Sequence, residues 1–167
     1  IKTSMYRPFT KQYLYYNRFL VTRPSRWAEL DSPNGIGPTI VFSGIGASKP
    51  FSSLIVSEIP EYLFLSNGQA ITLKAPIEGS GIEQKELTSF QIGNHDSLAK
   101  ESYSITDETI KRFQRTYNSK EITHHDVFYY IYGIFHSPFY RTKYQNDLKK
   151  MLPRIPFVND FRGYSNK

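Results

Sequence analysis

The chain has 167 residues, no cysteine and a net charge of +6. This length suits one domain that buries a sizeable core of its own. Without cysteine, disulfides and thiolate metal sites are excluded, and a cytoplasmic location is the simplest expectation. No apolar run approaches the roughly 18 residues of a membrane span, and no signal peptide is evident, so no membrane partner is expected. Because the chain opens on Ile1 and enters a strand-like segment at once, we expect it to be a fragment of a longer polypeptide.

Two basic ends flank an acidic middle. Residues 1–31 carry a charge of +4, residues 32–104 carry −3, and residues 105–167 carry +5. Basic surfaces attract phosphate because neutralising a polyanion releases its counterions. The pattern favours a nucleic-acid partner, although a soluble protein with a high pI would show the same totals.

The first half of the chain has the pattern of strands. Residues 6–16 alternate with period two and are rich in Tyr and Phe, which is typical of a strand, with Pro8 at its edge or start. Short apolar runs predict further strands at residues 38–43, 51–58, 62–65 and 69–74. They are joined by a flexible connection at residues 44–50 and a turn at residues 66–68, and residues 76–103 are expected to be mostly loop.

The second half has the period of helices. Thr106 is expected to cap a first helix, and Thr123 with Asp126 begins a second in a capping-box-like arrangement. Ser137 and Pro138 are expected to open a third helix, which buries side chains at a spacing of four. Its predicted stripe consists of Tyr140, Tyr144, Leu148 and Leu152.

This order of elements predicts an α+β fold. A mainly antiparallel sheet at about residues 6–75 is followed by a C-terminal three-helix segment at about residues 106–152. We expect a β-rich recognition part, residues 1–104, and a helical part, residues 105–167, to form one domain together.

Motifs at both ends resemble one known module. Residues 6–9, YRPF, resemble its YRPFDxRxLYYD opening, while residues 132–141, YGIFHSPFYR, and 152–156, LPRIP, are similar to its YGxLHSPxYR and LPRIP segments. The module is the C-terminal specificity, or target recognition, domain of type ISP restriction-modification enzymes and related large adenine-specific DNA methyltransferases. The resemblance covers about residues 5 to 161, and Thr10, Gln12 and Asn17 depart from the family pattern.

The resemblance implies a function and its partners. A bacterial parent enzyme would carry a nuclease, a helicase-like ATPase and an adenine methyltransferase, which use S-adenosylmethionine, ATP and Mg. This chain would hold no cofactor and perform no chemistry alone. It would recognise a sequence in double-stranded DNA for the methyltransferase domain of the same polypeptide.

Two loops provide the first candidate DNA contacts. The planar fork of arginine can pair with guanine or clamp a phosphate, and Arg18, Arg23 and Arg26 lie together before Trp27. Ser48 and Lys49 follow two glycines, which allow a backbone to approach DNA closely. A solvated basic loop and a simple connection would explain the same residues.

Further candidates lie in a turn and on the third predicted helix. Asn67 and Gln69 flank Gly68, and amides can recognise adenine, although a tight turn explains Asn67 equally well. Lysines of the third helix can lie along the phosphates of one DNA strand, although a charged helix face is usually only solvated. These are Lys143, Lys149 and Lys150.

Catalytic and metal-binding signatures are weak or missing in the sequence. Residues 83–85, EQK, lack the upstream Asp of a nuclease motif, and residues 44–49 do not complete a phosphate-binding loop of a nucleotide hydrolase. The adenine methyltransferase signature Asn/Asp-Pro-Pro-Tyr/Phe is absent. His124 and His125 favour capping or surface roles, and His136 a structural one. We therefore assign no catalytic or metal-binding residue.

Two other function classes stay open. The chain could be a protein-interaction module that docks onto the methyltransferase core without contacting DNA, in which case the exposed helix face should be apolar. It could also be a small nuclease, for which a metal-dependent cleavage assay is the test.

Overall fold

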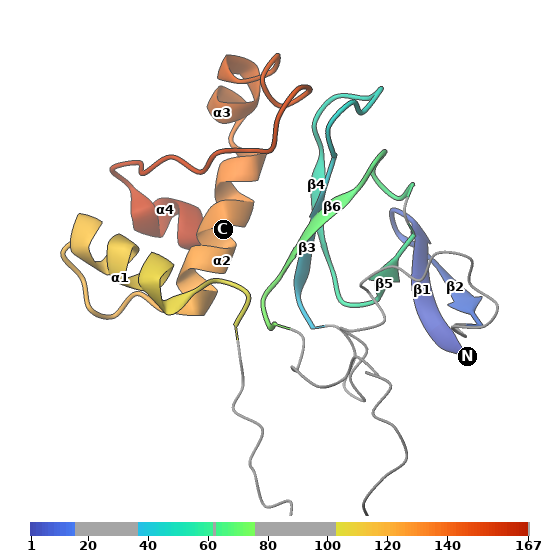
Figure 1. Ribbon diagram of the computed structural model, residues 1–167, viewed down its shortest axis with the longest axis horizontal. Helices are drawn as coiled ribbons and strands as arrows, with labels where there is room; N and C mark the ends of the chain where they lie inside the picture. Colours follow the sequence, from blue (N-terminus) through green and yellow to red (C-terminus); the bar gives the residue numbers. More distant parts are fainter. Residues whose placement is uncertain (16–36, 62, 76–102, 167) are drawn as a thin grey trace, which may run out of the picture.

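The computed structural model describes residues 1–15, 37–61, 63–75 and 103–166. In its first half, two small three-stranded sheets form (Figure 1). The first has the order β2-β1-β5, with β1 at Lys2–Arg7, β2 at Thr10–Leu14 and β5 at Ile59–Pro60. The second has the order β4-β3-β6, with β3 at Thr39–Phe42, β4 at Ser53–Val56 and β6 at Gln69–Thr72. The prediction of a mainly antiparallel arrangement is confirmed, with β1 and β5 as the one parallel pair among the described strands.

The start of the chain is a hairpin, so the single strand predicted at residues 6–16 is wrong. Strands β1 and β2 pair in antiparallel register on either side of a two-residue turn formed by Pro8 and Phe9. Proline suits the first central position of a turn because its φ is fixed near −65° and it has no N–H to pair. The chain is extended on both sides of the turn, so the period-two pattern continues across the turn and does not reveal it.

The strand predicted at residues 62–65 is also wrong. Leu63, Phe64 and Leu65 lie in turns, and the amide of Phe64 donates to the carbonyl of Glu61 at 2.9 Å. The apolar character of this run has another cause, which is the burial of Phe64 in a small core cluster.

Four helices follow among the described residues. They are α1 at Asp107–Thr116, α2 at His124–His136, α3 at Pro138–Lys143 and α4 at Phe161–Ser165. The predicted caps Thr106, Thr123 and Ser137 are confirmed, and Thr123 forms the full capping box with Asp126. Helix α4, which begins after Asp160, was not predicted.

The third helix is shorter than predicted. It ends at Lys143, and residues 144–150 form successive turns that still bury Leu148. Leu152, predicted to be buried, is exposed. Pro153 prevents a helix from continuing past it, because the carbonyl of Lys149 would find no amide there, but α3 already ends at Lys143.

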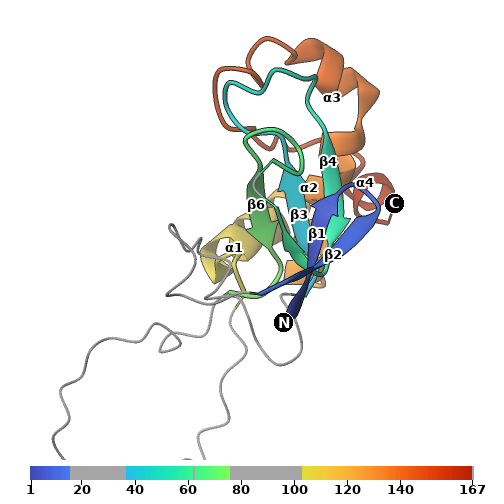
Figure 2. The ribbon, with the colours of Figure 1, turned by 90° about the vertical axis from the view of Figure 1, so that its right-hand side faces the viewer.

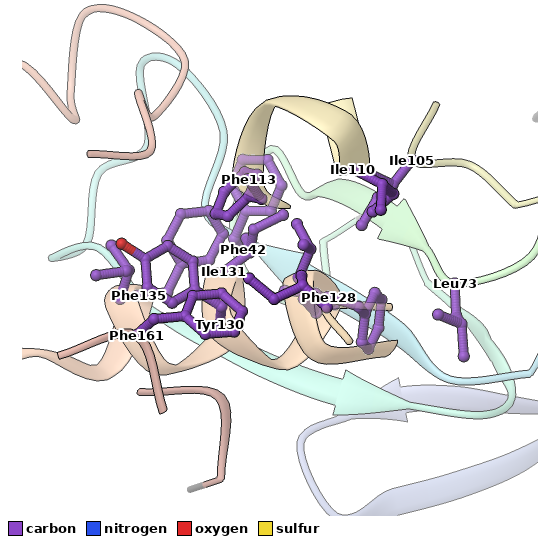
Figure 3. Close-up of a cluster of buried hydrophobic side chains, with 14 of the residues drawn as sticks. Phe42, Leu73, Ile105, Ile110, Phe113, Phe128, Tyr130, Ile131, Phe135 and Phe161 are labelled. Carbon is purple, nitrogen blue, oxygen red and sulfur yellow. The ribbon is translucent and has the colours of Figure 1, made fainter. Parts of the chain in front are cut away.

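The three layers of the molecule are the helices, the β4-β3-β6 sheet and the β2-β1-β5 sheet (Figure 1). Every residue of β3 is buried because both of its faces are covered. Ile40 and Phe42 pack in the large cluster with the helices (Figure 3), whereas Val41 packs with Met5 of β1 on the other side. The large cluster thus draws residues from both halves of the chain.

Helices α2 and α4 approach each other at a glycine. A Cβ at Gly133 would lie 2.3 Å from the carbonyl oxygen of Tyr164. The ring of Phe161 stacks on Tyr130, with centroids 4.9 Å apart. The hydroxyl of Tyr130 donates to the carbonyl of Pro156 at 2.6 Å and accepts from the amide of Val158 at 3.0 Å. This hydroxyl fixes the extended segment that leads to α4.

Candidate nucleic-acid interface

Three segments meet at one end of the β4-β3-β6 sheet, which we call the loop end. They are the loop between β3 and β4 (residues 43–52), the turn at Ser66 and Asn67, and the turns at residues 144–151 (Figure 2). The loop between β3 and β4 and the turn at Ser66 and Asn67 lie together because β3 ends where both of its antiparallel neighbours, β4 and β6, begin. A hydrogen bond of 3.0 Å from the amide of Gly46 to the carbonyl of Lys149 brings in the third segment.

The loop is anchored by close backbone contacts. A Cβ at Gly44 would lie 1.8 Å from the carbonyl oxygen of Asn67, so only glycine fits there. The amide of Gly44 donates to the carbonyl of Ser66 at 3.3 Å, and the side-chain amide of Asn67 donates to the carbonyl of Ile45 at 3.2 Å. The two turns therefore hold each other in place.

Aromatic packing fixes the far side of the same loop. Phe51 lies edge-on to Phe135 of α2, with ring centroids 5.3 Å apart, and it also contacts Phe42. The guanidinium of Arg141 lies 6.0 Å from the centre of the Phe51 ring and donates to the carbonyl of Phe135. Burial lowers the pKa of Arg141, while Tyr132 opposes this shift. An arginine stays charged at neutral pH, so Arg141 adds a fixed positive charge beneath the loop.

The exposed lysines of the loop end come from two distant parts of the sequence. Lys49 follows the exposed Ser48 in the loop, whereas Lys143, Lys149 and Lys150 belong to α3 and the turns after it. The ammonium group of Lys143 lies 5.3 Å from the ring of Tyr144. In the described part of the chain, none of these four lysines makes an ion pair.

Three cations elsewhere in the described residues are neutralised by carboxylates. Arg7 pairs with Glu61 at 2.8 Å, and Lys11 pairs with Glu58. Arg162 pairs with Asp126 at 2.6 Å. A phosphate would have to compete with a carboxylate at these positions, whereas the lysines of the loop end are available to it.

The amide candidates occupy different environments. Asn67 takes a positive φ of 51° and donates to Ile45, which agrees with the turn interpretation given above. Gln69 is exposed at the start of β6, opposite Phe42, and its contact with a base stays a prediction. Arg18, Arg23 and Arg26 lie outside the described residues, as do residues 83–85.

His124 and His136 have structural environments among the described residues. His124 stacks on Tyr103, with centroids 4.2 Å apart, and its Nε2 lies 3.1 Å from Asp107. The Nδ1 of His136 lies 3.0 Å from the carbonyl of Tyr132. Within the described ranges, no three His, Asp or Glu side chains gather as they would around a metal ion.

The apolar part of the loop end was not predicted from the sequence. Ile45, Phe139 and Met151 are exposed near the lysines, on the same three segments or on α3. Their residue types suggest burial, and only the tertiary structure shows that they face solvent. Among the described residues, no helix has the length and apolar character needed to cross a membrane.

The structure is thus an α+β domain that presents anchored, lysine-bearing loops at one end of a sheet. The chain belongs to the Type ISP C-terminal specificity domain family, whose model matches residues 1–167. A search of curated proteins finds no match.

Solved structures with the same fold are far longer chains. A cryo-EM structure of a DrdV–DNA complex has a TM-score of 0.78 and 28% identity, covering 99% of this chain and 15% of that chain. A nuclease-deletion mutant of the Type ISP restriction-modification enzyme LlaGI, in complex with a DNA substrate mimic, has a TM-score of 0.65 and 28% identity, covering 99% and 12%. The ATP-dependent Type ISP enzyme LlaBIII bound to DNA has a TM-score of 0.74 and 25% identity, covering 99% and 10%. The chain therefore spans 15% or less of these proteins.

Proposed function

We propose that this chain recognises a specific sequence in double-stranded DNA on behalf of a type ISP restriction-modification enzyme. The observation that supports this most strongly is the match over 99% of the chain to enzymes solved with DNA. Catalysis would belong to other parts of a cytoplasmic parent polypeptide, which would supply the nuclease, the ATPase and the adenine methyltransferase. The parent would use S-adenosylmethionine, ATP and Mg there, and this chain would position the DNA for the methyltransferase domain.

The loop end supplies the phosphate contacts in this proposal. Lys49 and Lys149 are exposed and make no ion pair within the described residues, and the bond from Gly46 to the Lys149 carbonyl holds Lys149 against the loop that carries Lys49. Phosphate contacts fix the register of a protein on DNA, and side chains from the loops then recognise base edges. Gln69 and the arginines between residues 18 and 26 are the candidates for that second role.

The exposed face of α1 argues against the alternative that the helices only dock onto another protein. That face carries Lys111, Arg112 and Arg115, with Asp107 and Glu108 in the first turn. Docking faces of stable interfaces are depleted in Lys, Asp and Glu at their centre. This face of α1 therefore lacks the apolar character that docking onto another protein would require.

Selection from a pool of random duplexes tests the proposed function. The 167-residue chain should enrich one family of sequences, and fluorescence anisotropy should show tighter binding to an enriched duplex than to its shuffled version. The affinity for both should fall steeply between about 50 and 200 mM salt, because counterion release drives the phosphate contacts. A pool without enrichment, together with an affinity that does not depend on salt, would rule the function out.

A further inference from the structure

The apex of the loop between β3 and β4 is an exposed isoleucine. Ile45 is 51% exposed and stands between Gly44 and Gly46. The amide of Ala47 donates to the carbonyl of Gly44 at 3.3 Å, and Gly46 has a φ of 74°, so these four residues form a tight turn with Ile45 at its first central position. A turn of this kind needs a positive φ at its second central position, which glycine adopts without strain. Since neither neighbour has a side chain, the isoleucine projects alone from the apex.

This apex is held in place before any ligand binds. The side-chain amide of Asn67 donates to the carbonyl of Ile45 at 3.2 Å. Gly44 and Gly46 donate their amides to the carbonyls of two other segments, at 3.3 and 3.0 Å. Each of the three residues around the apex is therefore bonded to a distant part of the chain. A loop anchored in this way loses little conformational entropy on binding, so its position can contribute to specificity.

The surroundings of the apex are basic. The three segments of the loop end contain Lys49, Lys149 and Lys150 against a single acidic residue, Asp147. In the part of the chain that the structure describes, none of these lysines makes an ion pair. Figure 2 shows the loop beside the turns that follow α3, which carry two of them. Lysines are depleted at the centre of protein interfaces and are attracted to polyanions, so this apolar apex lies in a surface that suits DNA.

The chemistry of Ile45 limits what it can recognise in DNA. Its side chain forms no hydrogen bond, and its carbonyl already accepts one from Asn67. At the base edges of the major groove, the apolar group is the C5 methyl of thymine. Insertion between base pairs would also bury the side chain, but it must offset the loss of base stacking. About half of the Ile45 surface is already covered, and the rest is too small to offset that loss.

We propose that Ile45 is a specificity-determining residue that packs against the C5 methyl of a thymine in the major groove. This inference rests on the proposed function, in which lysines of the loop end fix the register and side chains from the loops recognise base edges. The recognised sequence contains a T·A pair that this loop distinguishes by its methyl group. The anchored turn fixes where along the site that pair lies.

Selection from random duplexes with two variants tests the assignment. The unmutated chain should enrich a sequence with a fixed T·A pair, and Ile45→Ala should enrich the same sequence with the preference lost at that pair alone. Ile1→Ala is the matched control, because Ile1 is 86% exposed at the N-terminus, away from the loop end (Figure 1). It should leave every position unchanged. Both variants should keep the melting temperature of the unmutated chain, since both side chains are exposed.

Uracil in place of that thymine isolates the methyl group, because it keeps every hydrogen-bonding atom of the base. In anisotropy titrations, this replacement should weaken binding of the unmutated chain about fourfold, the value for one buried group of this size. It should not change the binding of Ile45→Ala. A merely structural role of Ile45 would weaken binding to the thymine and uracil duplexes alike.

Three results would overturn this inference and leave DNA recognition intact. They are an enriched sequence without a fixed T·A pair, a uracil effect of equal size in the unmutated chain and in Ile45→Ala, and a rise in the fluorescence of 2-aminopurine beside the pair that requires Ile45. The last result would show that the side chain unstacks the bases by insertion. A pool without any enrichment would overturn the proposed function and this inference together.

Discussion

The backbone amide of Gly46 donates a 3.0 Å hydrogen bond to the carbonyl of Lys149. A helical continuation would leave that carbonyl without a donor, because the residue four positions on is Pro153. The loop between β3 and β4 supplies the missing donor. One backbone bond thus closes the turns after α3 and places Lys149 beside the loop that carries Lys49.

The first prediction concerns the lysines of the loop end. Lys49→Ala and Lys149→Ala should each weaken binding to all duplexes by a similar factor, without changing the preferred sequence. Each should also reduce the slope of log affinity against log salt by about 0.9, the value for one lost phosphate contact. Anisotropy titrations at several salt concentrations measure both effects.

Lys111→Ala is the control for this experiment, because Lys111 is an exposed lysine of α1, away from the loop end. It should leave the salt slope unchanged. Equal slopes for all three variants would show that the loop end does not contact phosphate.

The second prediction concerns the contact between α2 and α4. Replacing a glycine by alanine inside a helix normally stabilises it by about 1 kcal/mol. At Gly133 the new Cβ would lie 2.3 Å from the carbonyl oxygen of Tyr164, so the backbone of α4 must move. Gly133→Ala should therefore lower the free energy of unfolding by about 1–3 kcal/mol in urea titrations. Thr116→Ala, at an exposed position of α1, should change it by a few tenths of a kcal/mol in the stabilising direction.

The third prediction concerns the buried hydroxyl of Tyr130. Burial and the hydroxyl of Tyr117 raise the pKa of Tyr130, so it is a neutral donor and acceptor at any ordinary pH. Tyr130→Phe would leave the carbonyl of Pro156 and the amide of Val158 without this partner. The free energy of unfolding should fall by about 1–3 kcal/mol. The matched control is Tyr129→Phe, whose hydroxyl has no hydrogen bond among the described residues, and a drop of the same size there would refute the explanation.

The fourth prediction is a pH dependence at the start of α2. Burial opposes ionisation of Asp126, but hydrogen bonds from Thr123 and the charge of Arg162 hold its pKa below the ordinary value of 3.8. A lowered pKa in the folded state stabilises the fold above pH 3.8, and this contribution is lost as the pH falls through the folded-state pKa. Asp126→Asn should thus lower the free energy of unfolding by about 1 kcal/mol at pH 7. The difference from the unmutated chain should shrink below pH 3.8.

Urea titrations at pH 7, 5 and 3 would measure this difference. Asp147→Asn serves as the control, because Asp147 is exposed and its carboxylate has no ion pair among the described residues. A cost for Asp126→Asn that stays constant at all three values of pH would contradict the assigned role of the charge.

Local features of the fold were predictable from the sequence because they depend on neighbouring residues. Thr106, Thr123 and Ser137 cap their helices as expected, since each side chain bonds an amide three residues away. Features set by distant contacts were not predictable. Helix α4 has five residues and forms against α2, and the third helix ends at Lys143, before turns whose Lys149 carbonyl accepts from Gly46 in another segment.

The candidate site likewise has features that could be predicted from the sequence and features that could not. The sequence by itself determined which residues carry positive charge and which family the chain resembles, because charge and motif are properties of the residues. Only the tertiary structure decided that Lys49 and Lys149, 100 positions apart, share one end of a sheet, and that Phe9 and Tyr13 face solvent instead of a core. Proximity and exposure depend on hydrogen bonds and packing between segments far apart in the chain. The order of residues along the sequence does not show these contacts.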